Sequence, residues 1–222
     1  MRTYFEYRAA ARETLEGRWN ETALMTLIII AIPALLGVST VCFPFMGLDE
    51  MSSIVMNSSV NGLTTLVSIL VIVPLECAMY NVFVSMIRGT MENDTPVKEM
   101  FVFFKQDWVR YVKTYILEMI IIFLISLITL GIGGIIFSYA YAMVPYLLHD
   151  YPELGAREAL RMSRELMKGH KWDLFVLQLT FLGWIILAIL TCGIGFLWLM
   201  PYMSAAQGHF YQDLKDELIV EE

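Results

Sequence analysis

Charged residues are scarce in this sequence. Only 17% of its 222 residues are Asp, Glu, Lys or Arg, whereas 58% are hydrophobic. Soluble domains carry about a quarter charged residues and about half apolar ones. A water-soluble fold of this composition would expose large apolar patches, so the composition argues against one and predicts that lipid is the solvent. The net charge of −7 says little, because in a membrane protein the placement of charges matters more than their sum.

Residue patterns that carry catalysis or bind metals and nucleotides are also missing. The sequence has no His-Glu-x-x-His, no Cys-x-x-Cys, no phosphate-binding loop and no Gly-x-Ser-x-Gly. We therefore expect no enzyme activity, no metal or other cofactor and no nucleic-acid partner. Three histidines are interpreted as membrane-interface residues: His149, His170 and His209. Three cysteines are interpreted as buried thiols: Cys42, Cys77 and Cys192. A Cys42–Cys192 disulfide on the outer side is the alternative for that pair.

Apolar runs long enough to cross a bilayer occur in four regions. Leu24–Met46 has no charge, and Leu63–Ile87 has a single acid. Val112–Leu148 and Leu174–Tyr211 are too long for one span, and each is interrupted by a Gly-Ile-Gly sequence. We expect tight turns at these glycines: Gly131, Gly133, Gly193 and Gly195. The prediction is an all-α membrane protein with six transmembrane helices arranged as three hairpins. Partial crossing by the two Gly-broken pairs is the alternative.

The basic residues predict the orientation. Lys and Arg mark the cytoplasmic side of short loops. They precede the first predicted span, separate the second from the third and the fourth from the fifth, and recur in the C-terminal tail. The loop Gly47–Gly62 and both glycine turns contain none. Both termini are therefore expected in the cytoplasm. The first 23 residues lack the apolar core of a cleavable signal peptide.

The sequence repeats itself within this single membrane domain. Thr129–Gly133 recurs as Thr191–Gly195, each between two apolar segments. A basic segment ending in a tryptophan precedes each hairpin: Trp19, Trp108 and Trp172. We divide the chain into three units, about 1–88, 89–149 and 150–222. Each would contain a cytoplasmic surface helix, a tryptophan anchor and a two-span hairpin. The alternative is that tryptophan and basic residues simply mark every membrane interface.

The surface helix of the third unit has the clearest pattern. Within Leu154–Gly169, apolar residues recur at helical spacing and charged residues occupy much of the rest. We expect an amphipathic helix, either in the headgroup plane or packed on the cytoplasmic ends of the spans. Its basic side chains are candidate contacts for anionic lipid headgroups: Arg157, Arg161, Arg164 and Lys168. Residues 4–19 show a looser version of the pattern.

Acids inside the predicted spans are the candidates for a polar site. A carboxylate within a bilayer is costly, so it usually faces a cavity, pairs with a partner or becomes neutral. Glu76 lies near the middle of the second span, Pro74 precedes it closely, and Tyr80 shares its helix face. Glu118 lies nearer the cytoplasmic side of the third span. Glu76, Tyr80 and Glu118 are therefore a candidate site for protons or cations, with a structural hydrogen-bonding role as the alternative.

Several motifs in the C-terminal half resemble a known family. These are Ser163-Arg164-Glu165-Leu166-Met167-Lys168-Gly169-His170-Lys171, Phe181-Leu182-Gly183-Trp184, Thr191-Cys192-Gly193-Ile194-Gly195, Pro201-Tyr202 and Phe210-Tyr211. They are similar to the bacterial integral membrane family catalogued as domain of unknown function 975, most clearly over 120–211. The resemblance implies a protein of the bacterial inner membrane. It implies no activity and assigns no functional residue.

Three functions fit these observations. The first is a non-enzymatic membrane scaffold or accessory protein, as the missing catalytic patterns and the large basic cytoplasmic face suggest. The second is a small transporter or channel with Glu76 in a polar path. It would be expected to assemble as a homo-oligomer or with another membrane protein. The third is a protein that binds or handles membrane lipids.

Overall fold

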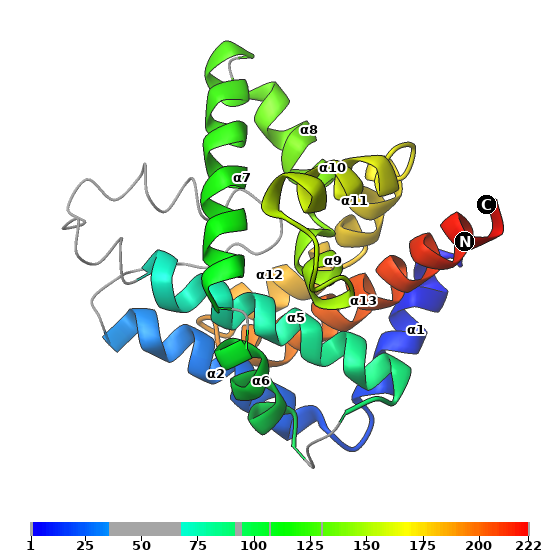
Figure 1. The fold of residues 1–222 in the computed structure, drawn as a ribbon. Helices are drawn as coiled ribbons and strands as arrows, with labels where there is room; N and C mark the ends of the chain where they lie inside the picture. Colours follow the sequence, from blue (N-terminus) through cyan, green and yellow to red (C-terminus); the bar gives the residue numbers. More distant parts are fainter. Residues whose placement is uncertain (1, 36–67, 92–94, 107, 130, 222) are drawn as a thin grey trace.

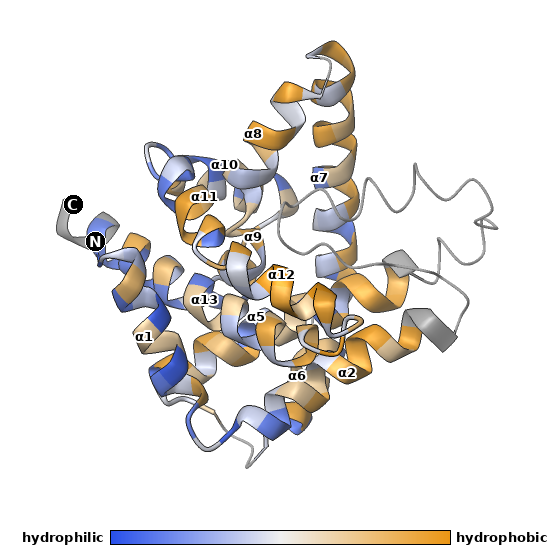
Figure 2. Ribbon diagram, turned by 180° about the vertical axis from the view of Figure 1, so that it is seen from behind, coloured by the Kyte–Doolittle hydropathy of each residue, from blue (hydrophilic) through white to orange (hydrophobic). Residues whose placement is uncertain are grey.

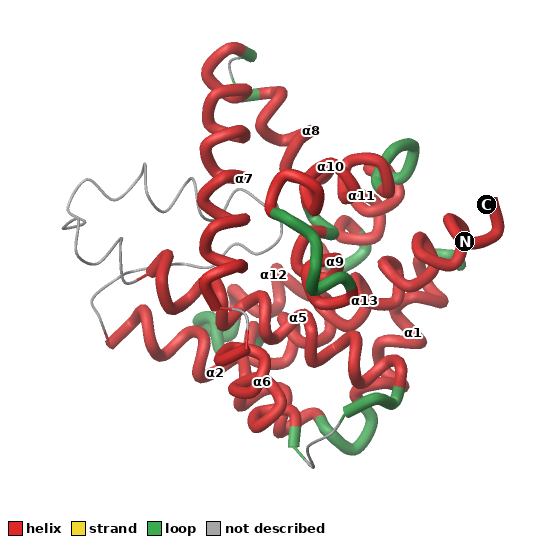
Figure 3. The backbone as a smooth tube through the Cα atoms, viewed as in Figure 1, coloured by secondary structure: helices red, strands yellow, loops and turns green. Residues whose placement is uncertain are grey.

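The computed structural model describes residues 2–35, 68–91, 95–106, 108–129 and 131–221. All regular secondary structure in these residues is helical, as the sequence predicted. The elements in chain order are α1 (Tyr4–Leu15), α2 (Trp19–Leu35), the π-helix η1 (Ser68–Ile72), α5 (Val73–Arg88), α6 (Pro96–Gln106), α7 (Trp108–Ile128), α8 (Ile132–Tyr141), α9 (Val144–Asp150), α10 (Ala156–Leu166), α11 (Lys171–Leu179), α12 (Leu182–Leu190) and α13 (Phe196–Glu221). Figure 1 shows their arrangement, and Figure 3 shows that short connections join most of them.

Three helical stretches are long and apolar enough to cross a membrane: Leu70–Arg88, Trp108–Ile128 and Ile132–Asp150. A fourth is added if α11 and α12, which meet at a bend of 41°, form one broken span. The first three match the second, third and fourth predicted spans. The described residues thus support a membrane protein with three or four candidate spans. Residues 24–35 of the predicted first span form the end of α2, whereas residues 36–46 and the loop that follows lie outside the described residues.

The α7–α8 hairpin projects beyond the other helices (Figure 1) and is apolar over its outer part (Figure 2). Ile120 is 51% exposed, Leu127 68%, and Ile128 81%. Leaving such side chains in water costs about 25 cal/mol for each Å² of apolar surface, whereas lipid removes that cost. This surface therefore supports the membrane assignment independently of helix length.

Helix α13 is the centre of the packing. It contacts α1, α2, α5, α10, α11 and α12, and Ala205, Ala206 and Phe210 are fully buried. Small residues allow close approach: a Cβ on Gly208 would lie 2.8 Å from Cδ1 of Ile87 on α5. The sequence predicted that the first half of this helix is a sixth span. It is not among the candidate spans of the described residues, because the polar and charged residues of its second half lower its hydropathy.

Pro74 explains the irregular start of α5. Proline has no N–H to donate to the carbonyl four residues earlier, which here belongs to Leu70. The chain forms the π-helix η1 just before this proline. The indole N–H of Trp108, at the start of α7, donates a hydrogen bond to the Leu70 carbonyl. This hydrogen bond links the helical stretch Leu70–Arg88 to α7.

Candidate functional site

Asp150 is the most highly coordinated side chain in the described part of the chain. It ends α9, and its side chain is only 2% exposed. Arg88 of α5 binds it with two hydrogen bonds, of 2.6 and 2.8 Å. From α13, the Tyr211 hydroxyl donates to it at 2.8 Å and the Lys215 ammonium at 2.6 Å. His149 Nδ1 lies 3.1 Å from the same carboxylate. We call these five residues the Asp150 cluster.

The other four residues of the cluster stabilise the negative charge of the Asp150 carboxylate at an unfavourable position. An acid at the C-terminus of a helix meets the negative end of the helix dipole, and burial removes its water. Charge-assisted hydrogen bonds from two cations offset both effects. These cations come from α5 and α13, so the cluster joins three helices that are distant in sequence.

A row of aromatic rings leads from the Asp150 cluster toward Glu76. The rings of Tyr211 and Tyr146 are stacked, with centroids 5.0 Å apart and planes at 18°. The centroid of Tyr80 lies 5.5 Å from that of Tyr146. Glu76 precedes Tyr80 by one turn of α5, and both side chains are half-buried. Tyr80, one of the three predicted polar-site residues, therefore lies next to a row of rings that ends at the Asp150 cluster. Glu76, a second one, lies one helical turn from Tyr80 on α5.

Glu118 lies on a different helix from Glu76 and Tyr80. It is half-buried on α7, which packs against α5, α8 and α10. The three-residue site predicted from the sequence stays a prediction.

The helix predicted over Leu154–Gly169 is found as α10, and its two sides differ. Its small and apolar side packs on α7, α8 and α9: Ala159, Leu160, Ser163 and Leu166 are buried. The Ser163 hydroxyl donates to the Ala140 carbonyl at 2.8 Å. Of the two placements left open by the sequence, the described contacts therefore favour packing on the membrane helices over burial of this side in lipid.

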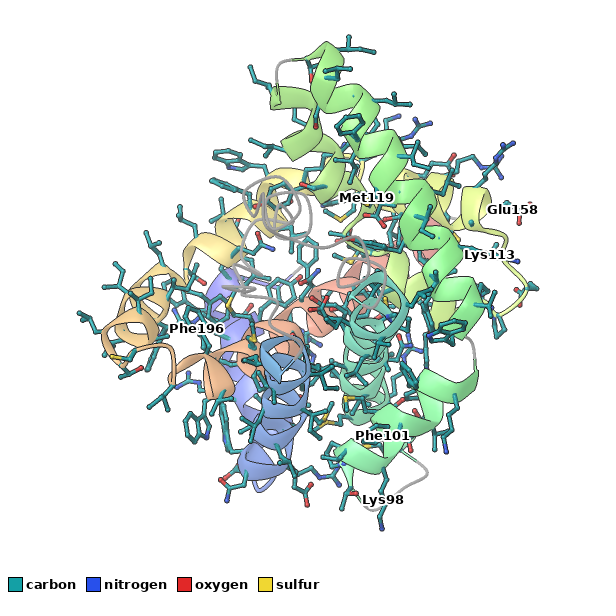
Figure 4. All side chains as sticks on the ribbon, turned by 90° about the vertical axis from the view of Figure 1, so that its left-hand side faces the viewer. Lys98, Phe101, Lys113, Met119, Glu158 and Phe196 are labelled. Carbon is teal, nitrogen blue, oxygen red and sulfur yellow. The ribbon has the colours of Figure 1, made fainter. Side chains whose placement is uncertain are left out.

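The opposite side of α10 and the turn after it carry four basic residues, which we call the basic stripe: Arg157, Arg161, Arg164 and Lys168. The three arginines are spaced by four and three residues, which places them on one face of α10, and Lys168 follows in the turn. All four are exposed. Figure 4 places Glu158, an exposed acid beside the stripe, at the edge of the molecule on α10, and Lys113 on the neighbouring α7.

The two Gly-Ile-Gly turns have the same hydrogen bonds. Gly131 and Gly193 adopt φ of 91° and 89°, a left-handed region that favours glycine. Their N–H groups donate to carbonyls five residues earlier, as in a Schellman helix end. The N–H groups of Gly133 and Gly195 then donate to the hydroxyls of Thr129 and Thr191, both at 2.9 Å. The predicted turns are found at these positions, and the threonine of each motif caps the following helix. The division into three units stays a prediction.

The prediction of buried thiols was wrong for Cys192, which is exposed within the second of these turns. Its φ of 53° lies in the left-handed region, which is unfavourable for a residue with a side chain. This conformation forms part of the tight turn. Cys77 is half-buried on α5. Cys42, and with it the alternative disulfide, lies outside the described residues.

His209 is buried between α13 and α1 rather than lying at an exposed interface. Its Nδ1 lies 3.3 Å from the Arg2 guanidinium, and its Nε2 lies 2.8 Å from the Thr14 hydroxyl. Because arginine only donates, Nδ1 must accept, and the ring proton sits on Nε2. The Thr14 hydroxyl accepts it and donates in turn to the Ala10 carbonyl at 3.0 Å. The site fits a neutral imidazole; burial, followed by the charge of Arg2, lowers the pKa of His209.

Stability should therefore decrease at mildly acidic pH. Since the pKa of His209 in the fold is lower than in the unfolded chain, the unfolded chain takes up the proton first, and stability falls as pH drops through about 6.5. The contribution of the neutral ring is fully present above that pH. Thermal unfolding in detergent at neutral and mildly acidic pH measures the effect. His209→Gln should remove part of the difference; an unchanged pH dependence in this variant would contradict the assignment.

Metal-binding geometry is missing from the part of the chain that the structure describes, where no three His, Cys, Asp or Glu side chains are placed to hold an ion.

Residues 109–217 match the family model of a protein of unknown function (DUF975). The match confirms the resemblance noted from the motifs. The matched region covers α8–α12 completely and most of α7 and α13. It contains the basic stripe, both glycine turns and every residue of the Asp150 cluster except Arg88.

No curated protein and no solved structure matches this chain. The DUF975 family model describes a protein of unknown function and so transfers no activity. The residues themselves therefore carry the functional argument.

Proposed function

We propose that this DUF975 protein is a non-enzymatic scaffold or accessory protein of the bacterial inner membrane that binds anionic lipid headgroups on its cytoplasmic face. The basic stripe of α10 carries the proposal. Three exposed arginines on one face of α10 and an exposed lysine in the turn after it lie beside the exposed apolar surface of α7 and match the chemistry of a phosphate-bearing headgroup above acyl chains. Each cation near an anionic surface contributes about 1 kcal/mol.

The orientation follows from the same charges. We place both termini and α10 in the cytoplasm, with six spans in three hairpins, because the basic segments alternate with uncharged turns along the chain. Under this topology the stripe meets the inner leaflet, and the glycine turns meet the outer side. Other subunits or membrane proteins are the partners expected for an accessory protein.

Lipid-dependent stability tests the lipid-binding proposal. We expect phosphatidylglycerol to raise the unfolding temperature of the protein in nanodiscs or mixed micelles more than phosphatidylcholine does. Arg161→Gln/Arg164→Gln should lose about half of this difference, because two of the four cations, each contributing about 1 kcal/mol of headgroup attraction, are removed. Glu158→Gln/Glu165→Gln on the same helix is the matched control and should retain it. Equal responses of the two double variants would overturn the assignment of the stripe.

A proton-conducting protein is the second candidate function, and the alignment of Glu76, Tyr80, Tyr146 and Tyr211 with the Asp150 cluster favours it. Proton flux into liposomes containing the purified protein is the direct measurement. Flux that Glu76→Gln abolishes is the expected result; a wild-type protein without flux would exclude this candidate.

A further inference from the structure

Two buried polar atoms among the described residues have no hydrogen-bond partner in the protein and lie close to α5. They are the hydroxyl of Tyr146 and Oδ1 of Asn81. Both residues are 0% exposed. Buried polar groups in folded proteins nearly always have a partner, and an isolated hydroxyl in an apolar interior is costly. The Tyr146 hydroxyl, which packs among other tyrosines, therefore marks a place where a small polar ligand would be bound.

The surroundings of Tyr146 suggest which ligand fits. The ring centroids of Tyr80 and Tyr211 lie 5.5 and 5.0 Å from that of Tyr146. A ligand at the Tyr146 hydroxyl would therefore lie among three phenol side chains. Water, which uses two to four such partners when buried, has the required size and chemistry.

We propose that Tyr80, Tyr146 and Tyr211, with water bound at the Tyr146 hydroxyl, form a path that carries protons between Glu76 and Asp150. The last connection is direct, since the Tyr211 hydroxyl donates to Asp150 at 2.8 Å. The Lys215 and Arg88 side chains around Asp150 are each 25% exposed, so the end of the path at the Asp150 cluster reaches solvent. This inference deepens the second candidate function and rests on it for net transport.

Proton transfer along the path is balanced at every member. A proton from the Glu76 carboxyl moves to the Tyr80 hydroxyl oxygen as that hydroxyl releases its own proton to the next oxygen. Water and the two remaining phenols each accept one proton and release one. The proton that leaves Tyr211 is accepted by the Asp150 carboxylate or passes to solvent, and Glu76 regains a proton from the opposite side of the membrane.

Two measurements separate failure of the path from failure of transport. The first is proton flux into liposomes that contain wild type, Tyr146→Phe or the control Tyr139→Phe. In the wild type the Tyr139 hydroxyl donates to Gln178 at 2.7 Å, and Tyr139 is not a member of the path. The second is the rate at which the Glu76 carboxyl exchanges its proton for deuterium. Infrared spectroscopy follows its C=O band, which Glu76→Gln identifies. This second measurement needs no net transport.

Tyr146→Phe should slow both flux and Glu76 exchange by about tenfold or more, since one hydrogen-bonding member is removed, while Tyr139→Phe changes neither. Wild-type exchange that Tyr146→Phe slows, without flux in any variant, would support the path and exclude transport. Equal exchange rates in wild type and Tyr146→Phe would overturn the path whether or not flux is seen. Deuterium exchange that is absent in wild type would also overturn it.

Discussion

Asp150→Asn is expected to destabilise the protein by about 3 kcal/mol, because it leaves Arg88 and Lys215 without their counter-ion in a largely buried site. The asparagine amide would also direct hydrogen-bond donors at three donating groups, including the Tyr211 hydroxyl. The value lies at the low end of the range for buried ion pairs, since both cations are 25% exposed and retain some hydration. Denaturant titration in detergent micelles measures the loss.

Asp216→Asn is the matched control for this variant. Asp216 is an exposed acid of the same helix, α13, and accepts one hydrogen bond from Gln212 at 3.1 Å. Its substitution should change stability by less than about 0.5 kcal/mol, as is usual for surface positions. If the two variants were equally stable, the Asp150 cluster would not hold α5, α9 and α13 together.

Gly195→Ala is expected to have the next largest effect. A Cβ at this position would lie 2.7 Å from Cα and 3.0 Å from Cβ of Ala188 on α12. Because the obstacle is backbone, the two helices must separate, and overpacking of this kind costs about 1–3 kcal/mol. Thermal unfolding in detergent measures the change, and the wild-type temperature retained in this variant would contradict the close approach of α12 and α13.

Two further glycine variants make this test specific. Gly183→Ala should be neutral or slightly stabilising, because nothing lies within 4 Å of the added carbon and alanine is the better helix former by about 0.5–1 kcal/mol. Gly133→Ala occupies the position equivalent to Gly195 in the other turn, but its near neighbours are side-chain atoms of Thr129 and Ile125. Moving Thr129 aside would break the hydrogen bond that its hydroxyl accepts from the Gly133 N–H, so Gly133→Ala should also destabilise the protein.

The sequence predicted the features that depend on local chemistry. Long apolar runs predicted α5, α7 and the α8–α9 stretch, because crossing a bilayer imposes a length and excludes charge. Both glycine turns were predicted, because a left-handed φ at Gly131 and Gly193 favours this residue type. These inferences need no knowledge of where other segments of the chain lie.

Features that depend on distant contacts could not be predicted in this way. The role of Asp150 could not be predicted, since its partners Arg88 and Lys215 are more than 60 residues away on either side. The burial of His209 could not be predicted either. Polar residues of α13 that are buried against other helices leave no periodic pattern in the sequence, so His209 was interpreted as an interface residue. Glu118 was grouped with Glu76 only because both are acids within apolar segments.

The central position of α13 also bears on the order in which the fold can form. The ribosome makes α1 first and α13 last, yet these two helices pack along each other, and the Tyr7 hydroxyl of α1 donates to Asp213 of α13 at 2.9 Å. Helices α1, α2 and α5 must therefore wait in the membrane or at its surface, with their inner faces uncovered, until synthesis is nearly complete. During that interval we expect a membrane insertase or chaperone to bind these uncovered faces. A nascent chain whose synthesis stops before α13 would be susceptible to proteolysis.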